Sequence, residues 1–269
     1  MTTSTEPSES FHIPIEAAEV YETAFVPAFF AQWAPILCEA AGVTAGQAVL
    51  DVACGTGIVT RTAADMLEPG GRVVGLDLNE AMLAVAARVR PNLEWRQADV
   101  MAIPFPDQSF DVVLSQMALM FFADRAGALR EMRRVVSDGG TVAVVVPDAL
   151  DAQPAFAPFM EMVAGHVGSE AMSLLTTYFV CGDLDELRRL VESAGLAVTK
   201  AFTHVGIYRA PSVDAAVTTE VESTPLIERI SEDVYRRIRE DARRVYRKFT
   251  SSDGSLEAPF ASNVVVARR

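Results

Sequence analysis

Two glycines close to an acidic residue, with a second acidic residue further along, indicate a ligand site. Residues 49–57 read Val-Leu-Asp-Val-Ala-Cys-Gly-Thr-Gly, and a second apolar run ends at Asp77, twenty positions after Gly57. Because glycine has no Cβ atom, its backbone can approach a ligand closely. A carboxylate at the end of a strand can accept hydrogen bonds from both hydroxyls of a ribose. The spacing therefore predicts a ligand of the nucleoside type over the carboxyl ends of two strands.

Two nucleoside ligands compete for this pattern. A dinucleotide fingerprint reads Gly-x-Gly-x-x-Gly with a later acidic residue, but the third glycine position here holds Thr60. That glycine normally permits close packing of helix and strand. Asp51 stands four positions before Gly55, and its negative charge would repel a pyrophosphate. Both departures weaken the case for a dinucleotide.

Three stretches of the chain resemble one enzyme family. Asp51-x-x-x-Gly55-x-Gly57 resembles motif I of the class I S-adenosylmethionine-dependent methyltransferases. Residues 98–114 are similar to the corresponding stretch of ubiquinone/menaquinone-type methyltransferases and their small-molecule relatives. Residues 130–140 resemble the family's helix and turn before the fifth strand, with Ser137-Asp138 in place of the usual Lys-Pro. The resemblance implies S-adenosylmethionine as cofactor, with Asp51 orienting the loop and meeting the ammonium of the methionine part, directly or through water.

The resemblance also implies roles for the glycine loop and for the segment that covers it. The backbone of Ala53, Cys54 and Gly55 would contact the methionine part of the cofactor. Asp77 would bind the ribose hydroxyls. Tyr21, in the N-terminal helical segment, would close over the cofactor.

A second group of implied contacts surrounds the base and the methyl group. Leu78 and Met82 would flank the adenine. Asp99 would accept a hydrogen bond from the adenine amino group, and the backbone N–H of Val100 would donate nearby. Gln116, just past the fourth predicted strand, would lie near the methionine part or the methyl group.

Strand and helix patterns alternate through the middle of the chain. Apolar runs predict strands, and periodic segments between them predict helices, one of them with Asn79 as N-cap. This alternation is typical of an α/β fold with a doubly wound, mostly parallel, Rossmann-like sheet. Asp138-Gly139-Gly140 is expected to form a turn into the fifth strand. The predicted strands are 48–53, 72–77, 93–97, 110–115 and 141–146, and the predicted helices 57–67, 80–89 and 124–136.

The last third of the chain departs from this alternation. Two late strands would complete a seven-stranded sheet with an antiparallel C-terminal strand, and the helices between them would form a lid. An amphipathic helix over 183–194 should end at Gly195. The late strands are 197–208 and 261–267, and helical segments cover 151–180 and 212–249. The expected division is a disordered tail at 1–13, a helical cap at 14–45 and a methyltransferase core at 46–269, with lid insertions near 150–180 and 212–250.

Composition excludes several classes of partner. The chain has 269 residues and a net charge of −13, which disfavours nucleic acid as substrate. Residues 2–10 contain no basic start of a secretory signal, and no apolar run has the length of a membrane span. Three widely spaced cysteines argue against a disulfide framework and favour the cytoplasm. We expect a small-molecule acceptor and no stable membrane insertion; the oligomeric state stays open, with a homodimer as one alternative.

The sequence contains few candidates for a general base. The three histidines are too few and too scattered for a metal site, and His166, within the expected lid, is the best placed of them as a base. Tyr178 is a comparable candidate. Cys54 could serve as a nucleophile, but no base stands near it, so a small residue in a tight loop explains it better. Cys38 and Cys181 are interpreted as buried small hydrophobes.

Residues 228–248 combine eight Arg or Lys residues with five Asp or Glu residues around an apolar stripe. A solvated amphipathic helix is the favoured interpretation. An anion-facing or membrane-surface helix is the alternative. The stripe consists of Ile230, Val234, Ile238, Ala242, Val245 and Phe249.

The resemblance implies in-line methyl transfer from a sulfonium, in which the enzyme aligns the reactants and excludes water. The sequence after the fourth strand, Ser115-Gln116-Met117-Ala118, lacks the Asn/Asp-Pro-Pro-Tyr/Phe signature of nucleobase amino methyltransferases. A small, partly apolar metabolite, methylated at oxygen or carbon, is the favoured acceptor. A non-catalytic S-adenosylmethionine-binding sensor or scaffold is the alternative, and a nicotinamide-dependent oxidoreductase is a third hypothesis.

Overall fold

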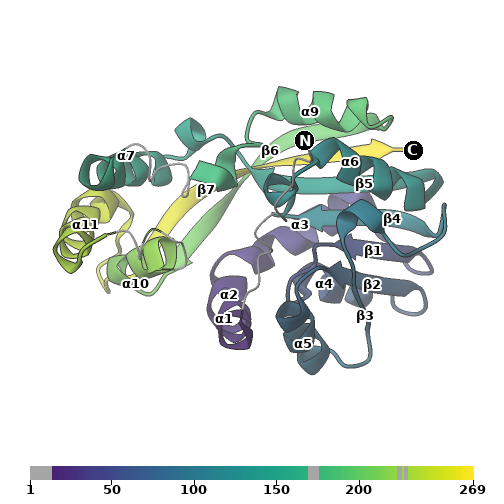
Figure 1. Ribbon diagram of the computed structural model, residues 1–269, viewed down its shortest axis with the longest axis horizontal. Helices are drawn as coiled ribbons and strands as arrows, with labels where there is room; N and C mark the ends of the chain where they lie inside the picture. The colour runs from purple at the N-terminus through teal and green to yellow at the C-terminus, as the bar shows by residue number, and fades with distance from the viewer. Residues whose placement is uncertain (1–13, 169–175, 223–225, 227–229) are drawn as a thin grey trace, which may run out of the picture.

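A seven-stranded sheet forms the centre of the protein (Figure 1). The computed structural model describes residues 14–168, 176–222, 226 and 230–269. The strand order is β3-β2-β1-β4-β5-β7-β6, and β7 alone runs antiparallel to its neighbours. The fold is therefore the α/β, doubly wound, mostly parallel sheet that the sequence predicts. The strands are β1 Ala48–Val52, β2 Arg72–Asp77, β3 Glu94–Gln97, β4 Phe110–Gln116, β5 Val136–Pro147, β6 Ala197–Ala210 and β7 Leu256–Arg268.

Helices cover both faces of the sheet because alternate strand residues point to opposite sides. Val49 packs with α3 (Trp33–Ala41) and α4 (Ile58–Met66) on one face. Leu50 packs with α6 (Arg125–Val135) and α9 (Leu184–Ser193) on the other. Strands buried on both faces read as continuous apolar runs, which explains why β1, β2 and β4 could be found in the sequence.

Local signals end several of these elements as expected, with one exception. The side chain of Asn79 accepts from the backbone N–H of Met82 and caps α5 (Glu80–Val89), and Gly195 follows α9 with φ +82°. The prediction of a turn at 138–140 that precedes the fifth strand is wrong in detail. β5 already begins at Val136, and its register with β4 shifts between Phe110 and Val112. Residues 137–140 therefore bulge within the strand, with Gly139 at φ +72°.

The N-terminal segment is a series of short helices. It runs through α1 (Ile15–Val20), η1 (Tyr21–Phe25), α2 (Val26–Ala28) and η2 (Phe30–Gln32) into α3. The chain bends by 57° between Ile15–Ala28 and Phe30–Ala41. Across the described residues no single helix is long and apolar enough to span a membrane, and this bent pair meets the criterion only jointly. Residues 1–13 lie outside the described part of the chain.

A two-stranded ribbon carries the helices that the sequence analysis expects to form a lid. β6 and β7 pair from Ala197–Arg268 to Ala210–Leu256, but β5 reaches β7 only as far as Ser262. The remaining length projects beyond the sheet, and Figure 1 shows α7, α10 and α11 gathered around it, at the left. The bounds of the lid elements are η5 Leu150–Ala152, α7 Phe156–Val167, η6 Thr177–Phe179, α10 Val213–Val217, η7 Thr218–Glu222, α11 Glu232–Val245 and η9 Tyr246–Phe249.

The apolar stripe of the charged helix is used inside the protein. Ile238 and Ala242 of α11 are buried, and the other four members pack partly buried against the same cluster. On the polar side, Arg243 forms an ion pair with Asp214. The favoured interpretation of an amphipathic helix is therefore confirmed for the described residues.

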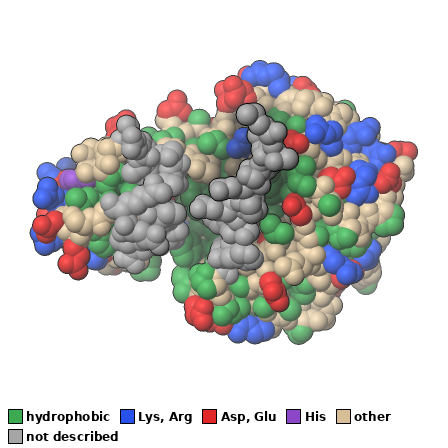
Figure 2. All heavy atoms as spheres, in the orientation of Figure 1, with side chains coloured by type: hydrophobic (Ala, Val, Ile, Leu, Met, Phe, Trp, Pro, Cys, Tyr) green, Lys and Arg blue, Asp and Glu red, His purple; other side chains and the backbone are tan. Residues whose placement is uncertain are grey.

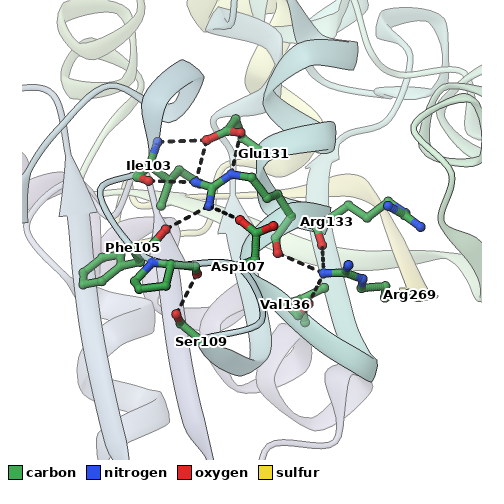
Figure 3. Close-up of polar contacts among 10 residues, drawn as sticks. Ile103, Phe105, Asp107, Ser109, Glu131, Arg133, Val136 and Arg269 are labelled. Atoms are coloured by element: carbon green, nitrogen blue, oxygen red, sulfur yellow. Dashed lines mark hydrogen bonds and ion pairs between the residues drawn. The ribbon is translucent and has the colours of Figure 1, made fainter.

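One arginine holds the loop between β3 and β4 (Figure 3). The Arg134 guanidinium donates to the carbonyls of Ile103 (2.8 Å) and Phe105 (2.9 Å) and to the carboxylates of Asp107 and Glu131. These contacts hold the pKa of the Glu131 carboxyl below its usual range. The loop contains η3 (Val100–Ala102) and follows Asp99 directly. Arg134, with a side chain that is 30% exposed, thus holds the loop that follows the residues expected to approach the adenine.

Candidate functional site

The ends of β1 and β4 meet where the strand order reverses. β1 lies between β2 and β4, so the chain leaves β1 and β4 in opposite directions across the sheet. Ligands of doubly wound sheets bind at this switch point. Ala53, directly after β1, and Met117, directly after β4, both adopt left-handed backbone at φ +57° and +52°. Non-glycine residues in this conformation are strained and gather at functional sites.

Asp51 lies at the base of the glycine loop with one oxygen unsatisfied. It is 1% exposed, and its Oδ2 accepts a 2.6 Å hydrogen bond from the Thr60 hydroxyl. Its Oδ1 is buried and has no hydrogen-bond partner in the described part of the chain. Burial penalises the carboxylate and raises its pKa to about 7, against the opposing effect of the Thr60 hydrogen bond. Thr60, which breaks the dinucleotide fingerprint, therefore serves to orient Asp51.

Asp77 ties the glycine loop to the end of β2. Its Oδ2 accepts from the Gly55 backbone N–H at 2.7 Å, and its Oδ1 accepts from the Asn79 backbone N–H at 2.8 Å. Burial raises the pKa of this carboxyl, and the backbone hydrogen bonds act in the opposite direction. A carboxylate has about four acceptor sites on its two oxygens, so Asp77 can accept a hydroxyl donor from a ligand in addition to these backbone donors.

The second glycine of the loop makes room for a tryptophan. Gly57 has φ +87°, and a Cβ atom there would lie 2.3 Å from Cη2 of Trp95. A Cβ atom at Gly75 would lie 2.5 Å from the same ring. The indole thus fills the space between β2, β3 and the start of α4. The sequence prediction missed Trp95, because nothing in its local pattern links it to the loop.

Tyr21 lies over the glycine loop. A Cβ atom at Gly55 would be 3.7 Å from Cε1 of Tyr21, and the tyrosine ring packs against Phe30 at 4.9 Å between centroids. Burial, followed by the charge of Asp77, raises the pKa of its hydroxyl. The position is the one expected from the sequence; its contact with the cofactor stays a prediction.

Gln116 brings an unsatisfied oxygen to the end of β4. Its Nε2 donates to the carbonyl of Phe30 at 3.1 Å, while its Oε1 is buried without a partner. Thr56 Oγ1 and Glu22 Oε2, on the loop and on η1, are also buried without partners. Buried polar atoms in native proteins are nearly always hydrogen-bonded. Their gathering around one loop, together with Asp51 Oδ1, fits a site that binds a polar ligand.

The expected adenine contacts lie at the β2–β3 end of the same edge. Leu78 is 55% exposed, and Asp99 is also exposed, with Oδ1 accepting from the Met101 backbone N–H at 2.8 Å. Val100 is buried. Met82 is buried as well, in a small cluster that includes Ala18 of the N-terminal cap. Met82 thus supports the cap helix, and its contact with the base stays a prediction.

The cysteines are structural in the described fold. Cys54 is buried, its Sγ lies 3.6 Å from the Gly55 carbonyl, and burial raises the pKa of its thiol well above the usual value. A thiol held protonated is a poor nucleophile. Cys38 is buried and Cys181 partly buried, and all three are free.

His166 is engaged within the lid. Its Nε2 lies 2.9 Å from Oδ2 of Asp241, which joins α7 to α11. Both helices surround the far end of the ribbon in Figure 1, away from the ends of β1 and β4. No described contact links His166 to the glycine loop, and its role as a base stays a prediction. Tyr178, in η6, lies nearer the expected site than His166 does. Its ring centroid is 5.3 Å from that of Phe121, which follows β4.

Comparisons with known proteins agree with this geometry. A family model described as a methyltransferase domain matches residues 50–144. A ubiquinone/menaquinone biosynthesis C-methyltransferase of Hahella chejuensis is 33% identical over 186 residues, 63% of this chain and 75% of that protein.

Solved structures show the same fold. One is a structure from Bacillus halodurans that its authors describe as a putative methyltransferase. It superposes with a TM-score of 0.60 at 20% sequence identity, over 87% of this chain and 97% of that one. A Haemonchus contortus phosphoethanolamine N-methyltransferase in complex with S-adenosylhomocysteine gives 0.58 at 18% identity, over 95% of this chain and 57% of that one.

The family match, the aligned relative and the order of motifs along the sheet agree. They show an enzyme that uses S-adenosylmethionine as methyl donor. The chain belongs to the class I S-adenosylmethionine-dependent methyltransferases, with a resemblance to the ubiquinone/menaquinone type.

Proposed function

We propose that the enzyme methylates a small, partly apolar metabolite at oxygen or carbon. The observation that carries this proposal is a continuous set of aromatic rings between the glycine loop and the lid. The ring centroid of Phe30 lies 4.9 Å from that of Tyr21 and 5.0 Å from that of Phe29. The ring centroid of Phe29 lies 4.7 Å from that of Phe260 in β7. Figure 2 shows hydrophobic side chains gathered between the lid and the sheet. Aromatic side chains of this kind suit contact with an apolar ring that carries few polar groups.

The residues around the loop fit the charge pattern of the cofactor. S-adenosylmethionine carries a sulfonium and an ammonium, and the carboxyls of Asp51 and Asp77 lie at the loop. Arg61, whose charge also acts on Asp51, is paired with Glu22. We assign the ammonium to Asp51 Oδ1 and the ribose hydroxyls to Asp77. Leu78, Asp99 and Val100 would receive the adenine. These assignments rest on the partnerless oxygen of Asp51 and on the strand-end position of the others.

When bound, the cofactor supplies a methyl group already activated on sulfur. The protein therefore has to hold the acceptor in line and keep water away. Tyr21 and Phe30 of the cap would cover the loop, and Gln116 would orient polar groups near the end of β4. A base is needed only where the attacking atom must lose a proton.

The named relatives support this acceptor class. The Hahella chejuensis relative is named for C-methylation in ubiquinone and menaquinone biosynthesis, which concerns ring compounds with apolar substituents. We extend the class, and not the particular substrate, to this enzyme. The alternative given in the sequence analysis, a non-catalytic sensor or scaffold, is set aside because the family and its relatives show an enzyme.

A radiometric transfer assay tests the proposal. Purified protein is incubated with methyl-labelled S-adenosylmethionine and, separately, with naphthols, hydroquinones, phosphoethanolamine or glycine. We expect label to enter the apolar ring compounds, with equimolar S-adenosylhomocysteine formed. Transfer only to phosphoethanolamine or glycine would contradict the acceptor class. Binding of S-adenosylhomocysteine without transfer to any of the ring compounds would also contradict the proposed acceptor class.

A further inference from the structure

An arginine joins the N-terminal cap to the glycine loop. Arg61, in α4, donates from Nη1 to the backbone carbonyl of Thr56 at 2.7 Å. Its Nη2 forms an ion pair with Oε1 of Glu22, in η1, at 2.9 Å. One guanidinium thus bridges the loop that is expected to hold the cofactor and the segment that lies over it.

This bridge is largely shielded from solvent. The side chains of Arg61 and Glu22 are only 12% and 17% exposed. A second ion pair, between Arg88 of α5 and Glu19 of α1, also ties the cap to the core, but its side chains are 59% and 47% exposed. Exposed pairs contribute little to stability, whereas removing one partner of a shielded pair is costly. The pair of Glu22 and Arg61 is therefore the stronger of these two ionic attachments.

The chain has a hinge where the outer part of the cap, Ile15–Ala28, meets the rest. The helical path breaks at Phe29, whose backbone has φ −139° and ψ −54°, and the segments on either side meet at 57°. Beyond this break the chain is fixed to the core. The side chain of Gln32 donates to the Ile207 carbonyl and accepts from the Ile207 N–H, both at 2.8 Å, and Trp33 is fully buried. Rotation at Phe29 would move the outer cap and leave α3 in place.

The packing of the outer cap is separate from the main core. Ala18 packs with Met82 and Val85 of α5 in a small cluster, apart from the two large clusters on the faces of the sheet. Val20, in the same helix as Ala18, is 52% exposed. Figure 1 shows α1 and α2 projecting from α3 alongside α5. Segments with few buried apolar contacts open at a low free-energy cost, so the outer cap can open while the sheet stays folded.

Polar atoms are left over on both sides of the bridge. Glu22 Oε2 and Thr56 Oγ1 are buried and have no hydrogen-bond partner in the described part of the chain. Because buried polar atoms are nearly always hydrogen-bonded, both atoms are suited to a polar ligand that lies against the loop. The ring of Tyr21, the neighbour of Glu22, is 3.7 Å from the position of a Cβ atom at Gly55. A ligand on the loop would therefore lie beneath the outer cap.

We propose that Glu22 and Arg61 form a latch that holds the outer cap closed over bound S-adenosylmethionine, and that this latch opens before S-adenosylhomocysteine leaves. Both residues act through Tyr21 and the glycine loop, so they are positioning residues and take no part in the transfer of the methyl group. The inference concerns the cofactor, and it does not depend on which acceptor the enzyme uses.

A latch acts mainly on the dissociation rate constant of the ligand. Because the ligand escapes from the open form, a weaker closed form raises this rate constant. The association rate constant should stay within about twofold of wild type or rise, since an open cap does not obstruct entry. A substitution that only unfolds part of the population lowers the fraction of protein that binds and leaves the dissociation rate of the remainder unchanged. The rate constants therefore distinguish a latch from an ion pair that only stabilises the fold.

The first experiment measures the release of S-adenosylhomocysteine from Arg61→Met and Glu22→Gln by surface plasmon resonance. The matched controls, Arg88→Met and Glu19→Gln, break the exposed pair between the cap and α5. The loss of a hydrogen bond between charged groups corresponds to a factor of about 10 to 100. We expect the dissociation rate constant to rise by this factor in each latch variant and to stay within about threefold of wild type in the controls. Equal rates in Arg61→Met and Arg88→Met, or unchanged rates in both latch variants, would overturn the inference.

A double variant tests whether the two residues act together. If Glu22 and Arg61 form one latch, then Glu22→Gln combined with Arg61→Met should release the ligand within about twofold of the faster single variant. Arg61→Lys should fall between wild type and Arg61→Met, because an ammonium keeps the charge but loses the fork that reaches both partners. Effects that multiply in the double variant would show that each residue acts alone and would contradict the latch.

Hydrogen exchange tests the hinge without relying on release of the ligand. In ligand-free Arg61→Met, the amides of residues 15–25 should exchange faster than in wild type, whereas those of α3 should be unchanged. Saturating S-adenosylhomocysteine should slow exchange at residues 15–25 of the wild-type protein. Equal exchange of this segment in variant and wild type, or faster exchange throughout α3 as well, would overturn the proposal of a latched cap.

Discussion

Cofactor binding should depend on the ionisation of Asp51. Burial raises its pKa to about 7, and its Oδ1 has no partner among the described residues. An ammonium bound at that oxygen favours the carboxylate, so ionised Asp51 is the binding form. The ionised fraction rises from about one eleventh at pH 6 to about ten elevenths at pH 8. The affinity for S-adenosylhomocysteine should therefore increase about tenfold over this range, which is about 1.4 kcal/mol.

The same shift has a consequence for the ligand-free protein. A carboxyl whose folded-state pKa is raised from 3.8 to about 7 is protonated in both states at low pH, and its ionisation disfavours the folded state as pH rises between these values. Stability from this group is thus present below about pH 4 and lost progressively up to about pH 7. Binding at pH 7 should release about half a proton, because half of the Asp51 population must ionise.

Titration calorimetry in two buffers of different ionisation enthalpy measures both quantities. Asp51→Asn removes the titrating group, and Asp65→Asn, an exposed residue of α4, is the matched control. We expect the variant at position 51 to bind weakly, with little pH dependence and little proton release. Any titration of the ligand itself would appear equally in wild type and variant. The reasoning is refuted if wild-type affinity is flat between pH 6 and 8, or if Asp51→Asn keeps the wild-type slope.

Three further perturbations follow from the same geometry. Gly57→Ala should lower the free energy of unfolding by about 2–4 kcal/mol, since it combines left-handed backbone with a Cβ atom 2.3 Å from Trp95. Gly46→Ala, at φ +85° with open space around it, should show only the backbone part in the same urea melt. Asp77→Asn should weaken S-adenosylhomocysteine binding at least tenfold by calorimetry while leaving the melting temperature within a few degrees; unchanged affinity would remove the ribose assignment. Arg134→Met should lower the free energy of unfolding by about 2 kcal/mol in the urea melt, because two carbonyls and two carboxylates lose their donor. A decrease no larger than that of a surface variant would show that the loop between β3 and β4 is stable without this arginine.

The sequence predicted the sheet well because its strands are buried on both faces. β2 and α5 were placed to the residue, since an apolar run and an N-cap at Asn79 mark their ends. The start of β5 was missed because Gly139 and its neighbours bulge inside a strand instead of turning ahead of it. The full length of β6 and β7 was missed because it depends on helices that pack on the ribbon from elsewhere in the chain.

Some residues of the site could also be predicted from the sequence, and others could not. Asp51, Gly55 and Asp77 lie on consecutive elements of one local motif, and the structure brings them together as expected. Trp95 could not be found, since it acts on Gly57, which is far away in the sequence, and does not stand in a recognisable pattern. Thr60 was available as a signal, because a hydroxyl in place of the third glycine needs a nearby acceptor.

The most direct test of the account is a crystal structure of the protein with S-adenosylhomocysteine. We predict the amino group within hydrogen-bond distance of Asp51 Oδ1, the ribose hydroxyls on Asp77 and the sulfur on the side of Tyr178. A ligand whose ribose lies away from Asp77, or whose amino group leaves Asp51 Oδ1 without a partner, would contradict the site described for this enzyme.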